Sequence, residues 1–171
     1  MSAEQPPIGV GTITTTDDVD SDLGKLYQLG NAIYRFVKTS TAIITNAGGK
    51  VLVLGLTAGV PNWTVSETTT AGDQEVAGVV PTTGSIAATT TFAASTRFMI
   101  QVSGPCTVQA ANTTVVNPAA LITATTAGTV SSMTTGVEGA AAVTSFLGYA
   151  TNTAAATAAN GAITCVLRSL V

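Results

Sequence analysis

Residues 98–171 contain only two charged side chains, Glu138 and Arg168, and consist mainly of Thr, Ala, Gly, Val and Asn. The whole chain of 171 residues has no histidine, and only 9% of its residues are charged. Such a sequence has few groups from which to build acid–base pairs or metal-ligand clusters. We therefore expect a structural or binding protein and not an enzyme, with no catalytic residues, no cofactor and no metal site.

The composition also limits the partners that the chain can have. Hydrophobic residues make up 46% of it and the mean hydropathy is +0.45, which is too apolar for an intrinsically disordered protein. A folded surface with so little charge is poorly protected against association, so we expect permanent assembly with other subunits. The net charge is −3 and the six basic residues are scattered, which argues against a nucleic-acid partner.

Export and membrane signals are not expected. Residues 1–10 are polar, include two prolines, and lack the basic start and apolar core of a signal peptide. The uncharged stretch 139–167 is interrupted by Thr, Ser, Asn and Gly well before it reaches about 18 consecutive apolar residues. We expect no secretion signal and no membrane partner.

Strand patterns dominate after residue 22. Residues 33–38 are mostly β-branched or aromatic and alternate between two faces, and the preceding Gly30-Asn31 pair predicts a hairpin turn. A helix over residues 23–36 is the competing interpretation. It is disfavoured because Gly24 and Gly30 would each cost about 1 kcal/mol in a helix.

Further strands are predicted where short apolar runs lie between turn residues. These runs are residues 26–29, 51–54, 74–80, 121–123, 129–130, 145–150 and 163–167. Alternation over residues 98–103, a turn at Gly104-Pro105 and a return over 106–110 predict a second hairpin. About nine or ten short strands predict an all-β fold, an antiparallel β-barrel or sandwich.

Residues 1–22 differ from the rest of the chain. They contain Pro6 and Pro7, and four aspartates lie within residues 17–22. At about 3.3 Å per extended residue, this segment is long enough to reach beyond its own domain. We predict an extended N-terminal arm over residues 1–22 and a β-rich domain over 23–171, which is a single unit or two small β subdomains. A disordered tail is the alternative for the arm.

The aspartate cluster only superficially matches a calcium-binding loop. Counted from Asp18, glycine comes one residue late, at Gly24, and the twelfth position is Leu29 where the loop requires a glutamate. A solvated acidic turn, or a docking patch for a basic surface, fits the pattern better.

Two residue types are rare enough to be considered singly. Cys106 and Cys165 are too few for a disulfide scaffold, so we expect two reduced, buried thiols, and whether they pair is left open. The single tryptophan, Trp63, follows Pro61-Asn62 between predicted strands and is expected to cover one end of a barrel. A partner contact is the alternative, since aromatic residues are enriched at interfaces.

Several segments occur in a characteristic order. They are LGNAIYRFVK (29–38) followed by TAI (41–43), VAGVV (76–80), RFMIQVSGP (97–105), FLGYA (146–150) and CVLR (165–168). In this order the chain resembles the head decoration, or cement, proteins of tailed bacteriophages, from about residue 23 to its end. Residues 1–22 and 57–73 have no counterpart in the resemblance.

The resemblance implies a β-rich subunit that binds the outer face of an assembled capsid and clamps adjacent major capsid subunits. It implies a homotrimer, a position on the surface of the phage head and synthesis in the cytoplasm of the bacterial host. We expect trimer formation to bury strands within residues 98–167 and the arm to contact the shell. The candidate capsid-contact residues are Ile8, Val10, Ile13, Asp17, Asp18, Asp20 and Asp22.

Two other classes of protein stay open. A self-polymerising tail-tube or appendage subunit would form filaments alone, whereas a cement protein should stop at a closed oligomer. A carbohydrate-binding β-sandwich would need exposed aromatic residues near Trp63, and only 5% of the chain is aromatic.

Overall fold

The computed structural model of the chain describes residues 5–40, 43–57, 60–67, 75–111, 115, 119–124, 127–132, 147–152 and 161–168. Within these ranges the chain forms ten strands and one short 3₁₀ turn, Asp20–Asp22, and no α-helix. The strands are β1 (Leu26–Leu29), β2 (Ala32–Thr39), β3 (Val51–Thr57), β4 (Val60–Glu67), β5 (Val76–Val79), β6 (Arg97–Ala110), β7 (Ala120–Thr123), β8 (Val130–Ser132), β9 (Gly148–Ala150) and β10 (Gly161–Leu167). The prediction of an all-β fold is confirmed.

The first predicted hairpin is present as β1 and β2. Leu29 pairs with Ala32, and Gly30 between them has a φ of 60°, a value that glycine adopts without steric cost. The strand interpretation of this region is therefore right, and the helical one is wrong. Residue 74 and residues 145–146, which the sequence also predicts as strand, lie outside the described residues.

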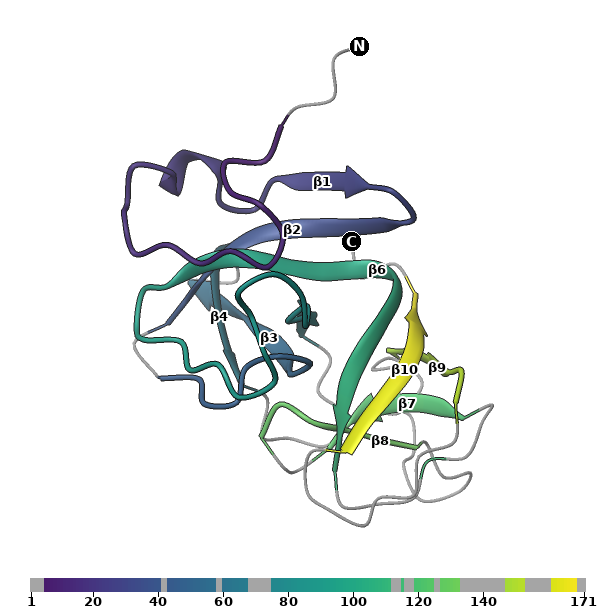
Figure 1. Cartoon of the computed structure of the whole chain (residues 1–171). Coiled ribbons are helices and arrows are strands. Elements are labelled where there is room, and N and C mark those ends of the chain that lie inside the picture. The colour runs from purple at the N-terminus through teal and green to yellow at the C-terminus, as the bar shows by residue number, and fades with distance from the viewer. Residues whose placement is uncertain are drawn as a thin grey trace.

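The predicted turn at Gly104-Pro105 is wrong, because β6 continues through both residues. Its first half pairs with β2 and its second half with β10, and Figure 1 shows the strand changing direction between the two. Gly104 has a φ of 95°, and a side chain there would collide with the backbone of Asn31. A glycine–proline pair signals a local change of direction, and here that change is a bend within one strand.

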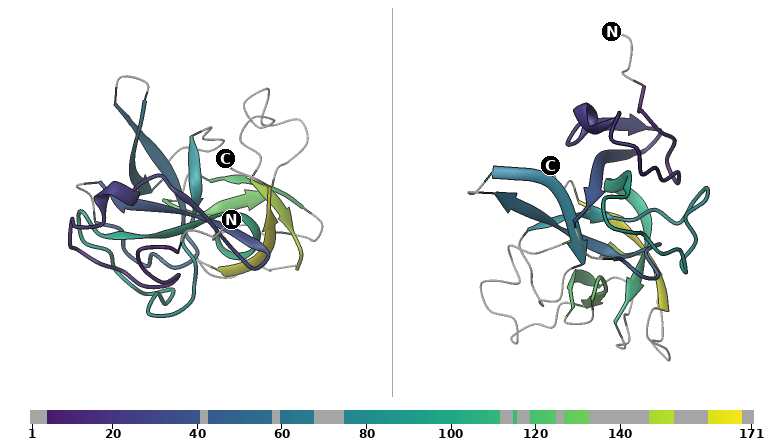
Figure 2. Two further views of the ribbon diagram at one scale, coloured as in Figure 1. Left: turned by 90° about the horizontal axis from the view of Figure 1, so that it is seen from above. Right: turned by 90° about the vertical axis from the view of Figure 1, so that its left-hand side faces the viewer.

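Strand β4 was not predicted. Its second residue is Pro61, which disfavours a strand in sequence-based reasoning, and its register with β3 shifts between Leu54 and Leu56. Trp63 lies at this irregularity with a φ of 57°, which is unusual for a bulky residue. The β3–β4 hairpin projects from the body of the molecule (Figure 2).

The strand pairings close two circuits that share β6. One circuit runs through β2, β4, β3, β5 and β6, and the other through β6, β10, β9, β7 and β8. Strand directions cannot alternate all the way round a closed circuit of five. Each circuit accordingly contains a parallel pair, β2–β4 in the first and β6–β8 in the second. The expectation of purely antiparallel pairing is therefore corrected to a mixed sheet.

Two hydrophobic clusters follow the circuits. The first contains Val37, Ile44, Leu52, Val65, Ile86, Phe92, Phe98 and Ile100, among others. The second contains Val108, Val115, Leu121, Val130, Leu147, Ile163, Cys165 and Leu167, together with Val51 and Val79 from strands of the first circuit. Because β3 and β5 contribute to the second cluster, the two circuits pack against each other as well as sharing β6.

Candidate interaction surfaces

The described part of the N-terminal segment, residues 5–22, lies beside β1, β2 and β6 (Figure 1). Three apolar side chains of this segment, and a fourth from the residue that directly follows it, are partly buried against a small third cluster. These are Ile8, Val10, Val19 and Leu23, and the cluster consists of Tyr27, Phe36 and Met99. Residues 5–22 therefore contact their own domain, and a reach to a neighbouring subunit stays a prediction.

Backbone hydrogen bonds connect this segment to the rest of the chain at two points. Thr14 exchanges hydrogen bonds with Arg97, with N···O distances of 3.0 and 2.8 Å. The N–H group of Ser85 donates to the carbonyl of Gly11 at 2.8 Å. Gly11 has a φ of 81° and lies so close to the backbone of Thr83 that a side chain would not fit.

An ion-pair network centred on Asp20 joins the segment to the sheet. The Nε and Nη2 atoms of Arg97 donate to the two carboxylate oxygens at 2.7 and 3.0 Å, and Lys38 Nζ lies 3.2 Å from Oδ2. The Arg97 side chain is only 7% exposed, and its Nη1 donates to the carbonyls of Thr15 and Ser95. The hydrogen bond from Arg97, aided by Lys38, lowers the pKa of Asp20, while the same bond raises the pKa of Arg97.

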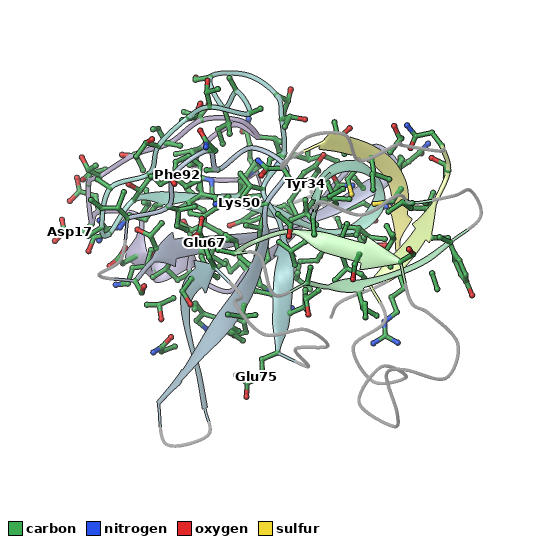
Figure 3. The ribbon with its side chains drawn as sticks, turned by 90° about the horizontal axis from the view of Figure 1, so that it is seen from below. Asp17, Tyr34, Lys50, Glu67, Glu75 and Phe92 are labelled. Carbon is green, nitrogen blue, oxygen red and sulfur yellow. The ribbon has the colours of Figure 1, made fainter. Side chains whose placement is uncertain are left out.

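The predicted capsid-contact residues fall into two groups. Ile13, Asp17 and Asp18 are exposed, and Figure 3 shows Asp17 at the margin of the molecule. The others have contacts inside the chain: Ile8 and Val10 pack on the third cluster, Asp20 binds Arg97, and Asp22 pairs with Lys25 at 2.6 Å. Their role as capsid contacts stays a prediction.

Trp63 is engaged by its own chain. The guanidinium carbon of Arg35 lies over the indole ring, 5.1 Å from its centroid, and Gly24 lies against the same ring. Arg35 is partly buried, which lowers its pKa, and its Nε atom has no hydrogen-bond partner among the described residues. Stacking on the ring compensates part of this loss of solvation. The contacts define a packing role for Trp63.

A row of apolar side chains, three exposed and one half-buried, crosses the second circuit. Val166 of β10 is in register with Pro105 of β6 on one side and Tyr149 of β9 on the other, and Tyr149 is in register with Ala120 of β7. Val166 is 46% exposed and Tyr149 57% exposed. We refer to these four residues as the outer row. Sequence reasoning missed it because the row is made by strands that lie far apart in the chain.

Strand β1 offers a second exposed feature. Among the described strands it pairs with β2 alone, so one of its edges is not covered by another strand. Leu26 and Leu29 on this strand are 47% and 40% exposed. An uncovered edge with apolar side chains is a recognised site of pairing with another chain.

Basic side chains are largely engaged within the molecule. Lys25, Lys38, Lys50 and Arg97 form ion pairs and Arg35 stacks on Trp63, which accounts for five of the six basic residues. The Lys50 side chain is 8% exposed and forms an ion pair with Glu67. Both residues are labelled in Figure 3. Most of the positive charge in the described residues therefore lies beside a carboxylate or an aromatic ring of the same chain.

In the described ranges, no group of three or more His, Cys, Asp or Glu residues could hold a metal ion. No helix in that part of the chain has both the length and the apolar character to cross a membrane.

The fold places the chain in the all-β class. No family model matches it, and no curated protein matches its sequence. A solved structure similar to it is that of the head fiber gp8.5 N base in bacteriophage phi29. The two share 11% sequence identity and a TM-score of 0.48, over 82% of this chain and 98% of the other.

Proposed function

We propose that this chain is a non-enzymatic structural protein of a bacteriophage head, a decoration or cement subunit on the outer surface of the capsid. In this proposal it acts as a homotrimer and bridges adjacent major capsid subunits. The support from sequence is the resemblance that runs from about residue 23 to the C-terminus. The support from structure is the outer row, which is the observation that carries the proposal.

The outer row has the properties of a subunit interface. Its side chains stand on paired strands, so little conformational entropy is lost when a partner covers them. Tyrosine is enriched where proteins bind each other, and Tyr149 is the most exposed large side chain of the row. We assign this surface to contact between subunits, consistent with the expectation that strands within residues 98–167 are buried by trimer formation.

The exposed part of the N-terminal segment is assigned to the shell. Ile13, Asp17 and Asp18 are accessible in the single chain, whereas Asp20 is held by Arg97. Adjacent carboxylates at Asp17 and Asp18 suit a basic edge of a capsid protein. Exchanging both for lysine should weaken capsid binding and leave the oligomer intact.

The proposal is tested by light scattering of the purified protein, followed by pelleting with undecorated capsids. We expect a closed trimer that pellets with the capsids. Val166→Asp should weaken subunit association at least about tenfold, because a charge would be buried without a partner. Thr89→Asp, at an exposed position outside the outer row, is the matched control and should behave like the wild type. Unchanged association of Val166→Asp would exclude the outer row as the interface.

The appendage alternative is favoured by the uncovered edge of β1. If chains paired through this edge, the protein would form open filaments without capsids. Leu26→Lys should then abolish the filaments, because a charged residue on an edge strand opposes pairing with a second strand. Electron microscopy of the protein alone distinguishes filaments from closed trimers.

A further inference from the structure

Cys106 and Cys165 lie directly opposite each other on neighbouring strands. They are a register pair of the antiparallel β6–β10 ladder, and their sulfur atoms are 3.3 Å apart, with both thiols free. The two cysteines are 59 positions apart in the sequence, so no local pattern indicated that they would be neighbours. The two sulfurs are therefore candidates for a disulfide bond.

The spacing of the two Cα atoms allows a disulfide bond. Thr164 accepts a hydrogen bond from Thr151 at 2.8 Å and donates one to Asn152 at 2.8 Å, so its backbone groups point toward β9. The backbone groups of the next residue, Cys165, therefore point toward Cys106. Opposed residues of this kind have Cα atoms about 5.5 Å apart, which is within the usual range for disulfides. The bond requires the sulfurs to approach from 3.3 Å to about 2.05 Å and the two Cβ atoms to lie within about 4.5 Å, so β6 and β10 must move slightly toward each other at this pair.

The surroundings explain why the thiols can stay reduced. Cys165 is fully buried in the second cluster, and Cys106 is partly exposed, so an oxidant meets Cys106 first. The hydrogen bond with Cys165 and burial both raise the pKa of Cys106. Because the thiolate is the reactive form, we expect oxidation to be slow at neutral pH.

We propose that Cys106 and Cys165 form an intramolecular staple between β6 and β10 when the protein meets a low-molecular-weight disulfide. Cys106 loses its proton and attacks one sulfur of that disulfide, which releases one small thiol and leaves a mixed disulfide. Cys165 then loses its proton and attacks the Cys106 sulfur, which releases the second small thiol. Two electrons pass from the protein to the oxidant, and one disulfide replaces another.

The staple would act on the stability of the second circuit. It would join two of its strands across a loop of about 59 residues, so it restricts the unfolded chain considerably. We expect the melting temperature of the oxidised protein to rise by about 5–10 °C. The staple forms within a single chain and does not require capsid binding.

The experiment uses the full chain in two arms, with glutathione disulfide as the oxidant. In one arm the folded protein is incubated for days, and in the other the unfolded protein refolds in a glutathione redox buffer. We expect loss of both thiols, a mass lower by two hydrogens, a Cys106–Cys165 peptide in a non-reducing digest, and the rise in melting temperature. Reduction should reverse all four.

Cys106→Ser is the control, since a partly exposed serine is tolerated better than a change at buried Cys165. It should show no difference in melting temperature between oxidising and reducing buffer. Free thiols in both arms, a persistent mixed disulfide on Cys106, or disulfide-linked dimers would each overturn the proposal. An intramolecular bond that leaves the melting temperature unchanged would overturn its stabilising role.

Discussion

At the level of single side chains, Asp20 is the main electrostatic link between the N-terminal segment and β6. Asp20→Asn should lower the free energy of unfolding by about 1–3 kcal/mol, because nearly buried Arg97 would lose its charged acceptor. Asp18→Asn, at an exposed carboxylate, is the control and should change it by less than about 0.5 kcal/mol. Urea unfolding measures both, and equal losses would contradict the assigned role of Asp20.

The same network makes stability depend on pH. The pKa of Asp20 in the folded chain is below the ordinary value of 3.8, to which it returns on unfolding. Its contribution is therefore fully present above the unfolded pKa and is lost as the pH falls through the folded pKa. The difference in urea midpoint between wild type and Asp20→Asn should shrink as the solution is acidified from neutrality to below about pH 3. A difference that stays constant would show that Asp20 acts through uncharged contacts.

Gly24 and Gly30 form a natural pair for separating packing from backbone strain. Both have positive φ, 86° and 60°, but a side chain would strike Trp63 at Gly24 and meet nothing within 4 Å at Gly30. Gly30→Ala should cost about 1 kcal/mol, from backbone strain alone. Gly24→Ala should cost about 2–4 kcal/mol and shift the tryptophan fluorescence. Similar costs for the two would mean that the indole moves aside freely.

Among the strands, β6 is the one on which the architecture depends, and its bend depends on Gly104. Gly104→Ala should destabilise the protein by about 2–4 kcal/mol, because it adds strain at a φ of 95° and a collision with Asn31. Urea unfolding, compared with Gly30→Ala, measures the excess over strain alone. A loss no larger than that of Gly30→Ala would indicate that β2 and β6 can separate at this point.

Element prediction succeeded where the signal was local. The β1–β2 hairpin follows from one turn and an alternating strand, and β10 follows from the short apolar run over residues 163–167. It failed at β4, which contains Pro61 and a register shift, because β4 is held by neighbours on both sides. The bend at Gly104 was predicted as a hairpin turn, because a Gly-Pro pair gives the same sequence signal in a bend within one strand as in a turn between two strands.

For the molecule as a whole, we predict a single cooperative unfolding transition. Val51 and Val79 of the first circuit pack in the second cluster, and β6 belongs to both circuits, so neither should persist alone. Trp63 fluorescence reports on the first circuit and reactivity of Cys165 toward a thiol reagent on the second. The two signals should change at the same urea concentration. Separate midpoints would instead establish two β subdomains.

The composition and the alternation of side chains were enough to establish the all-β class, the scarcity of charge and several strands, because these depend on residues close together in the chain. They did not reveal the parallel pair in each circuit, the packing of residues 5–22, the outer row or the Cys106–Cys165 pair. Each of these depends on which distant strands become neighbours and in what register. That choice follows from how the whole chain buries its apolar surface, and local patterns do not contain it.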